Sequence, residues 1–458
     1  MRNLLPLPGG ARVLLLAASF LVLITGVALA DDDLFVPGGE GDGPSRDAAV
    51  SADGRFVTFA SEATNLVSDD NNELSDVYVH DRQTGDTARV SLGADEQEAN
   101  GYSEVPALSA DGRFVAFHSA ADNLVPADNN MDLDVFVYDR QAGTTARVSV
   151  ASDGAQAAGG SYRAALSADG RLVAFVSTAV NLDPRDADPQ PDVYVHDRQS
   201  GATELISVNR QGTAAAGFAG PPALSVDGRF VAFSSASSDL VAGDENDFED
   251  VFVHDRQTGQ TTRVSVRSDG DEVFADSYDP ALSADGRFVA FWSYATELTD
   301  DPDVSGWNVY VHDRQMGATT LISRGMGGPA DGGSIRPRLS ADARVVVFES
   351  QATNLTVTPD ANGLADIFAH DRQTGLTALV SVGAAGPGDG ESQTPAITPD
   401  GRYVVFHSGA TNLVSDDNNG TTDVFIRDRT AGMTGRVSLA AAELTPVDAL
   451  IYLPAVIR

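Results

Sequence analysis

The chain has 458 residues, no cysteine and a formal net charge of −36 at pH 7. A surface this acidic repels phosphate backbones and anionic lipid, so we expect no nucleic acid partner. The absence of cysteine excludes disulfides, so the stability of the fold must come from other contacts.

The N-terminus has the layout of a secretory signal. Residues 1–30 carry Arg2 and Arg12, then an apolar run, and they end on Ala28-Leu29-Ala30 before acidic residues. This pattern predicts a cleavable signal peptide rather than a retained anchor, and therefore a secreted protein that is extracellular, periplasmic or on the cell surface. No other apolar stretch is long enough to span a bilayer, so we expect no membrane span after cleavage. Residues 31–43 form a short N-terminal lead.

Residues 44–439 consist of one unit of about 58 residues that occurs seven times. Each copy contains a variant of Ser-Ala-Asp-Gly-Arg-Phe-Val, and a later Asp-Arg pair keeps the same period. The first Asp recurs at Asp53, Asp111, Asp169, Asp227, Asp285, Asp342 and Asp400, and the pair begins at Asp81, Asp139, Asp197, Asp255, Asp313, Asp371 and Asp428. A fixed period of this size is typical of a propeller, a solenoid or an array.

Within one copy the pattern predicts four short strands. In the fifth copy these are residues 279–283, 288–292, 308–312 and 319–323, separated by turn residues and without helical periodicity. The sequence therefore predicts an all-β fold, a seven-bladed β-propeller of four-stranded antiparallel blades. The tight Asp-Gly-Arg and Asp-Arg-Gln-Thr-Gly turns must share one face of such a disc. The longer connections share the other, the long-loop face, where we expect binding.

Two features of the turns have structural interpretations. Most copies place Gly after the first Asp, but the sixth has Ala343, which predicts a strained or altered turn there. The Asp-Arg pairs are expected to brace neighbouring blades through side-chain hydrogen bonds.

These motifs resemble those of the TolB-like, WD-repeat-like propeller family, whose usual Ser-Pro-Asp-Gly is nearly intact at Thr398-Pro399-Asp400-Gly401. The resemblance covers all seven copies and implies a propeller, but not one activity. Members include periplasmic protein-binding propellers, lids of serine peptidases and some polysaccharide lyases. The peptidase branch would need a Gly-x-Ser-x-Gly elbow, which the printed sequence lacks. The lyase branch implies a cluster of His and acidic metal ligands at the central opening, and it stays open.

An acidic loop precedes the predicted third strand in six copies. It has the spacing Asp-x-Asn/Asp-x-x-x-Asp, whereas the fifth copy breaks it with Pro302 and Asn308. Oxygen ligands at this spacing suit Ca²⁺, although the same residues are common turn formers on a solvated surface. The candidate ligands are Asp70, Asn72, Asp76, Asp128, Asn130, Asp134, Asp186, Asp188, Asp192, Asp244, Asn246, Asp250, Asp360, Asn362, Asp366, Asp417, Asn419 and Asp423.

The histidines fall into two groups. Five occupy one position of the third strand and are interpreted as structural: His80, His196, His254, His312 and His370. His118 and His407 stand instead at a second-strand position that varies among copies, where Trp292 and Glu349 also occur. A position that varies while its neighbours repeat can specialise, so these four residues are candidates for contact with a ligand or a lyase-like metal.

The last segment, residues 440–458, is either a ring-closing strand or a sorting tail. Together the patterns predict a secreted, monomeric, non-catalytic binding or scaffold propeller stabilised by Ca²⁺. Its partner, a protein or a glycan, is expected on the long-loop face. The alternative is an extracellular polysaccharide lyase or hydrolase of the TolB-like propeller type.

Overall fold

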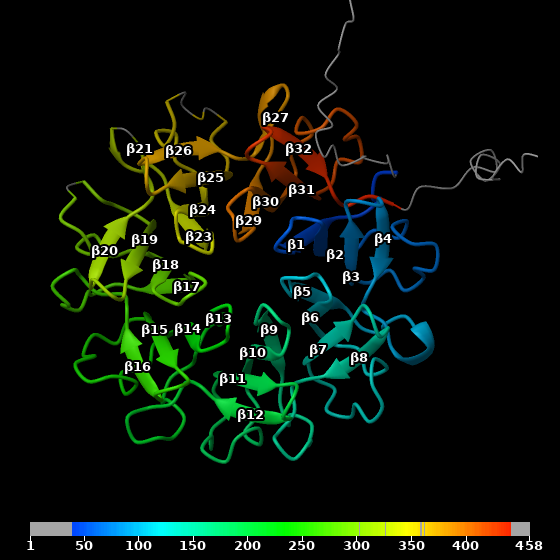
Figure 1. Cartoon of the computed structure of the whole chain (residues 1–458), viewed down its shortest axis with the longest axis horizontal. Helices are drawn as coiled ribbons and strands as arrows, with labels where there is room; N and C mark the ends of the chain where they lie inside the picture. Colours follow the sequence, from blue (N-terminus) through cyan, green and yellow to red (C-terminus); the bar gives the residue numbers. More distant parts are fainter. Residues whose placement is uncertain (1–38, 302, 326, 358–359, 361, 441–458) are drawn as a thin grey trace, which may run out of the picture.

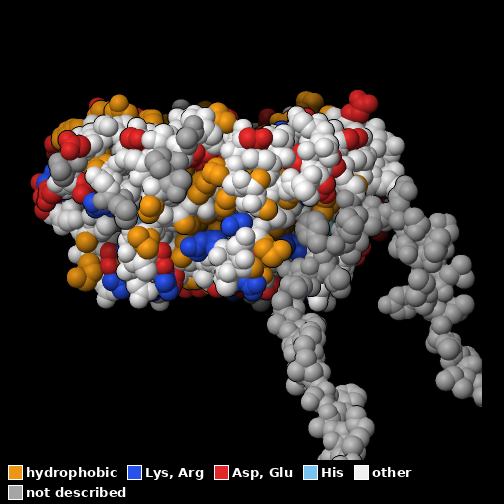
Figure 2. All heavy atoms as spheres, turned by 90° about the horizontal axis from the view of Figure 1, so that it is seen from above, with side chains coloured by type: hydrophobic (Ala, Val, Ile, Leu, Met, Phe, Trp, Pro, Cys, Tyr) orange, Lys and Arg blue, Asp and Glu red, His pale blue; other side chains and the backbone are white. Residues whose placement is uncertain are grey.

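The computed structural model describes residues 39–440, except 302, 326, 358–359 and 361, and shows seven β-sheet blades arranged in a ring (Figure 1). The edge-on view shows a flat disc with basic side chains gathered mainly in its lower half (Figure 2). The prediction of a seven-bladed propeller is confirmed. The predicted signal peptide and the segment after Ala440 lie outside the described residues.

Each blade is an antiparallel meander whose four strands follow one another in the chain. The strands are β1 (Ser45–Val50), β2 (Phe56–Ser61), β3 (Asp76–Asp81) and β4 (Asp86–Arg89) in blade 1; β5 (Ser103–Leu108), β6 (Phe114–Ser119), β7 (Asp134–Asp139) and β8 (Thr144–Arg147) in blade 2; β9 (Ser161–Leu166), β10 (Leu172–Ser177), β11 (Asp192–Asp197) and β12 (Ala202–Leu205) in blade 3; β13 (Ala223–Leu224), β14 (Phe230–Ser235), β15 (Asp250–Asp255) and β16 (Gln260–Arg263) in blade 4; β17 (Ser277–Leu282), β18 (Phe288–Ser293), β19 (Asn308–Asp313) and β20 (Ala318–Leu321) in blade 5; β23 (Ser334–Leu339), β24 (Val345–Ser350), β25 (Asp366–Asp371) and β26 (Leu376–Leu379) in blade 6; and β29 (Ser392–Ile397), β30 (Tyr403–Ser408), β31 (Asp423–Asp428) and β32 (Met433–Arg436) in blade 7. The connections between blades hold the 3-10 turn η1 (Ala94–Glu96) and the small hairpins β21 (Arg324–Gly325) with β22 (Gly328–Pro329) and β27 (Val382–Gly383) with β28 (Gly386–Pro387).

The hydrophobic core lies between neighbouring blades. One cluster joins Val77 and Val79 of β3 to Val115 and Phe117 of β6, in the next blade. Strands in the middle of a blade are therefore covered on both faces, which explains their nearly continuous apolar sequences. Within blade 1, Phe59 pairs with Tyr78 across β2 and β3, and their ring centroids are 5.9 Å apart.

The innermost strand of most blades carries a bulge. The residue at the bulge has a positive φ although it is not glycine, at Asp47, Val105, Arg163, Asp279, Arg336 and Thr394. Blade 4 has Pro221 at this position, and the ring of proline fixes φ near −65°. The first strand of blade 4 is accordingly only two residues long, Ala223–Leu224.

The ring closes without strand exchange, because blade 1 is built from β1–β4 and blade 7 from β29–β32. A single bridge joins Glu40 to Leu439, and the Ala440 N–H donates to the Gly39 carbonyl at 2.8 Å. Whether the segment after Ala440 contributes to closure lies outside the described residues.

The Asp-Arg pairs need a partial correction, because most of their side-chain hydrogen bonds stay within one blade; the exception is Arg256 of blade 4, which donates to Glu204 of blade 3 at 3.1 Å. Arg55 of the first turn donates to both carboxylate oxygens of Asp81, at 2.8 and 2.6 Å. The arginine of the next pair reaches the neighbouring blade by stacking instead, with Arg140 over the ring of Phe56. Hydrogen bonding was predicted between blades because the spacing alone does not show that Arg55 and Asp81 face each other across β2 and β3.

The third-strand histidines have a structural role. In blade 5, Nδ1 of His312 lies 2.9 Å from the Thr319 hydroxyl, which donates to the Val266 carbonyl of blade 4 at 2.5 Å. Because the hydroxyl has only one proton to donate, Nδ1 of His312 must carry the proton of the ring. In blade 7 the donor-only Arg427 replaces the histidine and donates to Thr434 at 3.0 Å.

The turn at Ala343 is strained rather than altered. Its N–H donates to Ser340 at 2.8 Å, as Gly286 does to Ser283 at 2.9 Å, and its φ is +54°. The backbone of the glycine turn is therefore retained with a side chain in the left-handed region.

Candidate functional sites on the long-loop face

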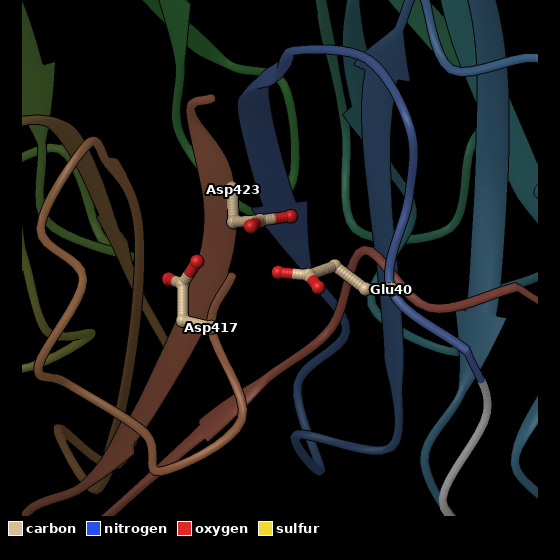
Figure 3. Close-up of side chains that lie close together, drawn as sticks. All are labelled: Glu40, Asp417 and Asp423. Atoms are coloured by element: carbon tan, nitrogen blue, oxygen red, sulfur yellow. The ribbon is translucent and has the colours of Figure 1, made fainter. Parts of the chain in front are cut away.

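The acidic loops connect the second and third strands of their blades, on the long-loop face. In blade 1, Asp70 of the loop lies near Asp76, which begins β3, and near Glu98 from the connection to blade 2. Blade 7 repeats this arrangement with Asp417, Asp423 and Glu40, whose carboxylates point toward one another (Figure 3). Four such groups have ligand atoms within 4.8 Å of one another, the other two being Asp186, Asp188 and Asp192, and Asp244, Asp250 and Glu272. These partly buried acidic clusters could hold a metal ion.

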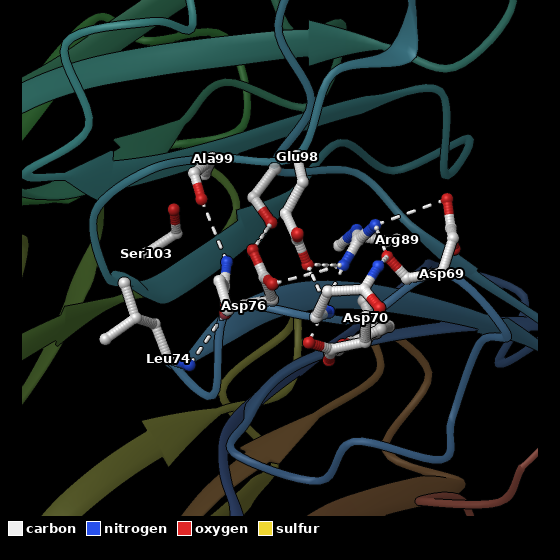
Figure 4. A network of polar contacts seen from close by, with 12 residues as sticks. Asp69, Asp70, Leu74, Asp76, Arg89, Glu98, Ala99 and Ser103 are labelled. Atoms are coloured by element: carbon white, nitrogen blue, oxygen red, sulfur yellow. Dashed lines mark hydrogen bonds and ion pairs between the residues drawn. The ribbon is translucent and has the colours of Figure 1, made fainter.

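Arginine lies inside most of these clusters. In blade 1, Nη1 of Arg89 lies 2.6 Å from Glu98, 3.4 Å from Asp76 and 3.9 Å from Asp70 (Figure 4). In blade 2, Nη1 of Arg147 lies 3.2 Å from Asp128 and 3.6 Å from Asp134. In blade 4, Nη1 of Arg263 lies 3.2 Å from Asp244, 3.2 Å from Asp250 and 2.5 Å from Glu272. In blade 7, Nη1 of Arg436 lies 2.9 Å from Glu40, 3.8 Å from Asp417 and 3.7 Å from Asp423. In blades 1, 2, 4 and 7 the carboxylates therefore already have a buried cation.

Burial dominates the electrostatics of the first aspartate of the third strand. Removal from water raises the pKa of Asp76 to about 6, although hydrogen bonding from Ser91 and the charge of Arg89 act in the opposite direction. Asp250 behaves in the same way, with its pKa raised to about 6 by burial.

Blade 3 has Leu205 at the end of its fourth strand, β12, where blade 1 has Arg89. Asp186 accepts a hydrogen bond from the Tyr194 hydroxyl at 2.5 Å, and Asp192 accepts one from Ser207 at 2.5 Å. Oδ2 of Asp192 is buried and has no hydrogen-bond partner within the described chain. Burial, reinforced by the charges of Asp186 and Asp188, raises the pKa of Asp192 to about 7.

Blades 5 and 6 differ again. In blade 5, Asn308 replaces the aspartate and accepts from Ser323 at 2.8 Å. In blade 6, Leu379 replaces the arginine, and the Asn362 amide donates to Asp366 at 2.7 Å. The six predicted acidic loops are thus not six copies of one site.

The four variable second-strand residues do not gather into one site. Glu349 and His407 belong to one network through Thr394, whose N–H donates to Glu349 at 3.4 Å and whose hydroxyl lies 2.7 Å from Nδ1 of His407. His118 in blade 2 is buried, and its Nδ1 has no partner among the described residues. Burial lowers the pKa of both His118 and His407 to about 4. None of the groups able to hold a metal in the described chain contains a histidine.

The fourth variable residue, Trp292, belongs to an aromatic cluster that the sequence analysis did not identify. Its ring centroid lies 4.8 Å from that of Tyr278 and 4.6 Å from that of Trp307, and Tyr294 lies 5.0 Å from Trp307. These four residues, the blade 5 aromatic cluster, include both tryptophans of the chain. Tyr278 and Trp292 pair across β17 and β18, at strand positions that vary among the copies. Tyr294 and Trp307 lie in the adjoining loops, for which the periodicity gave no signal.

Exposed aromatic side chains follow the same face. Every exposed large aromatic residue of the described chain lies in, or directly beside, a long-loop connection, namely Tyr102, Phe218, Phe248, Phe274 and Tyr294. Near the cluster, burial raises the pKa of Glu249 to about 7, and the neighbouring charge of Asp276 adds to this rise.

In the described part of the chain, no helix is both long and apolar enough to cross a membrane. No family model matches the sequence, and no curated protein matches it.

Comparison with solved structures shows the fold alone. The β-propeller domain of the Trilobed protease from Pyrococcus furiosus matches with a TM-score of 0.53 and 12% identity, over 88% of this chain and 99% of that one. An oligogalacturonate lyase in complex with manganese matches with a TM-score of 0.51 and 14% identity, over 84% and 90%. TolB from Acinetobacter baumannii also matches, with a TM-score of 0.40 and 14% identity, over 86% and 77%. The propeller fold expected from the resemblance is confirmed, and the first two of these structures, a protease domain and a lyase, share it.

Proposed function

We propose that the mature chain is a secreted, non-catalytic binding propeller whose partner, a protein or a glycan, contacts the long-loop face at blades 4 and 5. The observation that carries this proposal is the confinement of exposed aromatic side chains to that face. Four of these five residues lie in blades 4 and 5 or in the connections that lead into them.

The chemistry of this surface fits recognition. Aromatic rings offer a large apolar area with little loss of conformational freedom, and they are enriched among residues that dominate binding energy. Phe274 is 66% exposed and Tyr294 is 52% exposed, whereas Trp292 is half-buried and packs against Trp307, which contacts Tyr294. The half-buried carboxylate of Asp276 on the same connection adds a hydrogen-bond acceptor for the hydroxyls of a sugar or the donors of a protein.

The alternative, a polysaccharide lyase or hydrolase, has less support. The lyase resemblance implies histidine and acidic ligands around one metal, but His118 and His407 do not join any metal-capable acidic group in the described chain. His407 is instead engaged with Thr394, and burial lowers its pKa. We therefore place the function in binding rather than in catalysis.

The test is to probe a glycan array and an extracellular protein extract with the secreted mature chain, after N-terminal sequencing has checked cleavage before Asp31. Tyr294→Ala and Trp307→Ala should each weaken binding of the captured ligand by roughly tenfold or more, as expected for residues at the centre of an interface. The matched control is Met316→Ala, which alters an exposed side chain of the same blade on the tight-turn face. Binding that survives both aromatic substitutions, or that is lost with Met316→Ala, would contradict the proposal.

A further inference from the structure

Blade 3 departs from its neighbours at three coupled positions. Asp188 stands where blades 1, 2, 4, 6 and 7 have asparagine, and Leu205 stands where blades 1, 2, 4 and 7 have arginine. Ala214 stands where those four blades have a carboxylate or amide, at Glu98, Gln156, Glu272 and Glu40. Blade 3 therefore lacks the asparagine amide and the arginine guanidinium as donors, and it gains the carboxylate of Asp188 in the loop. It also lacks the side chain from the connection between blades that contacts the loop in the other four blades.

The consequence falls on one oxygen, Oδ2 of Asp192. In the other acidic-loop blades, the equivalent oxygen accepts from Arg89 at 3.4 Å, from Asn130 at 3.1 Å, from Asn246 at 3.3 Å, from Asn362 at 2.7 Å or from Asn419 at 2.9 Å. In blade 3 neither donor exists. Asp192 has a relative exposure of 0%, and its Oδ2 has no partner within the described residues.

A buried carboxylate oxygen without a donor is costly, because the charge has left water and nothing replaces the lost hydrogen bonds. Within the described chain, no guanidinium lies in ion-pair distance of Asp186, Asp188 or Asp192; the nearby Arg185 pairs with Asp183 at 2.8 Å instead. Three carboxylates meet here without a cation from the protein. The turn-forming role of Asp188, whose Oδ1 accepts from the Gln190 N–H at 2.9 Å, does not satisfy Asp192.

We propose that blade 3 binds one Ca²⁺ ion between Asp186, Asp188 and Asp192, in the place that an arginine side chain occupies in blades 1, 2, 4 and 7. One oxygen from each of these residues lies within 4.8 Å of the other two. The ligand atoms are all carboxylate oxygens on a loop and the strand that follows it, and Ca²⁺ accepts such oxygen ligands in a flexible geometry, whereas Mg²⁺ demands a near-ideal octahedron. Asp188 is half-buried and gives the ion access from solvent.

Blade 6 provides an internal comparison. It also lacks the arginine, but it keeps Asn362, which donates to Asp366, and its loop offers only two carboxylates. The proposal therefore assigns one ion to the propeller rather than six. It does not depend on the partner proposed for the long-loop face.

The experiment is calorimetric titration of the chelator-treated mature chain with CaCl₂, paired with thermal melts. We expect one equivalent of bound Ca²⁺ and a rise in melting temperature. Asp188→Asn should abolish both effects. It should also raise the melting temperature of the calcium-free protein, because the new amide can donate to Asp192 as it does in blade 7. A residue that only formed the turn would leave the calcium response unchanged when its charge is removed.

Two further variants complete the test. Asp417→Asn, the matched control in blade 7, should leave the stoichiometry at one. Leu205→Arg should bring an internal cation into blade 3 and make the melt indifferent to calcium. The absence of any calcium effect, a stoichiometry near six, or calcium binding that survives Asp188→Asn would each overturn the proposal.

Discussion

The guanidinium carbon of Arg140 in blade 2 lies 4.1 Å from the ring centroid of Phe56 in blade 1. The same cation–π contact between neighbouring blades recurs at four further pairs: Arg198 and Phe114, Arg314 and Phe230, Arg372 and Phe288, and Arg82 and Tyr403. The last of these joins blade 1 to blade 7. Arg140 also donates to the Gly112 carbonyl at 2.6 Å. Only a planar guanidinium can stack and donate in its plane at once, and all 30 basic residues of this chain are arginines.

Arg140→Lys should therefore destabilise the propeller by about 1 kcal/mol, the worth of a partly buried cation–π contact. The measurement is urea-induced unfolding. The matched control is Arg429→Lys, because Arg429 makes the same bond to the Gly401 carbonyl at 2.5 Å, but the neighbouring blade has Val345 at the strand position that Phe56 occupies in blade 1. Equal losses in the two variants would show that stacking contributes nothing.

The strained turn at Ala343 gives a prediction of opposite sign. A side chain in the left-handed region costs about 1–2 kcal/mol, whereas glycine loses about 0.4–1 kcal/mol through its freer unfolded state. Ala343→Gly should thus stabilise the protein by up to about 1 kcal/mol in equilibrium unfolding.

The control for this prediction is Gly286→Ala, the reverse exchange in blade 5. A Cβ atom at Gly286 would lie 2.3 Å from Cδ2 of Phe230, so this variant should be destabilised by more than the turn strain alone. A loss of stability in Ala343→Gly would mean that its methyl group contributes packing that outweighs the strain.

The buried histidines predict how stability responds to pH. Burial lowers the pKa of His312 to about 4 in the folded state, from an ordinary value of 6.5. The unfolded chain therefore binds the proton first, and the free energy of unfolding falls as the pH drops from about 6.5 to about 4. At about 1.4 kcal/mol for each pKa unit, this histidine contributes roughly 3 kcal/mol to the fall.

His312→Gln isolates that contribution, because the glutamine amide can still donate to Thr319 but does not titrate. Buried carboxylates such as Asp250 act in the opposite direction over a similar range, yet they are the same in both proteins. The comparison is urea unfolding of the two proteins at several pH values between 7 and 4. Parallel pH profiles would rule out a neutral, buried His312 as a source of the acid sensitivity.

The repeat period predicted the number of blades and of strands because each copy contains its own turn residues. It also located the carboxylates, since Asp70 and Asp76 belong to one loop and the strand that follows it. The period could not place Arg89 among them, because Arg89 lies on the next strand and meets Asp76 only through the antiparallel register. Glu98 arrives from the connection to blade 2 and depends on how blades pack. A comparison of the copies held the signal: arginine at positions 89, 147, 263 and 436 gives way to leucine at 205, 321 and 379.

That exchange can be imposed on blade 4. Arg263→Leu leaves Asp244, Asp250 and Glu272 without their cation, and removal of one partner from a buried ion pair costs about 3–5 kcal/mol. In an Asp188→Asn background, where blade 3 should be silent, Ca²⁺ should then recover part of this loss by taking the place of the guanidinium. The measurement is the free energy of unfolding with chelator and with saturating CaCl₂. Recovery that is equally large when Arg263 is intact would show that calcium acts elsewhere. No recovery at all would show that calcium cannot replace arginine as the positive charge of these loops.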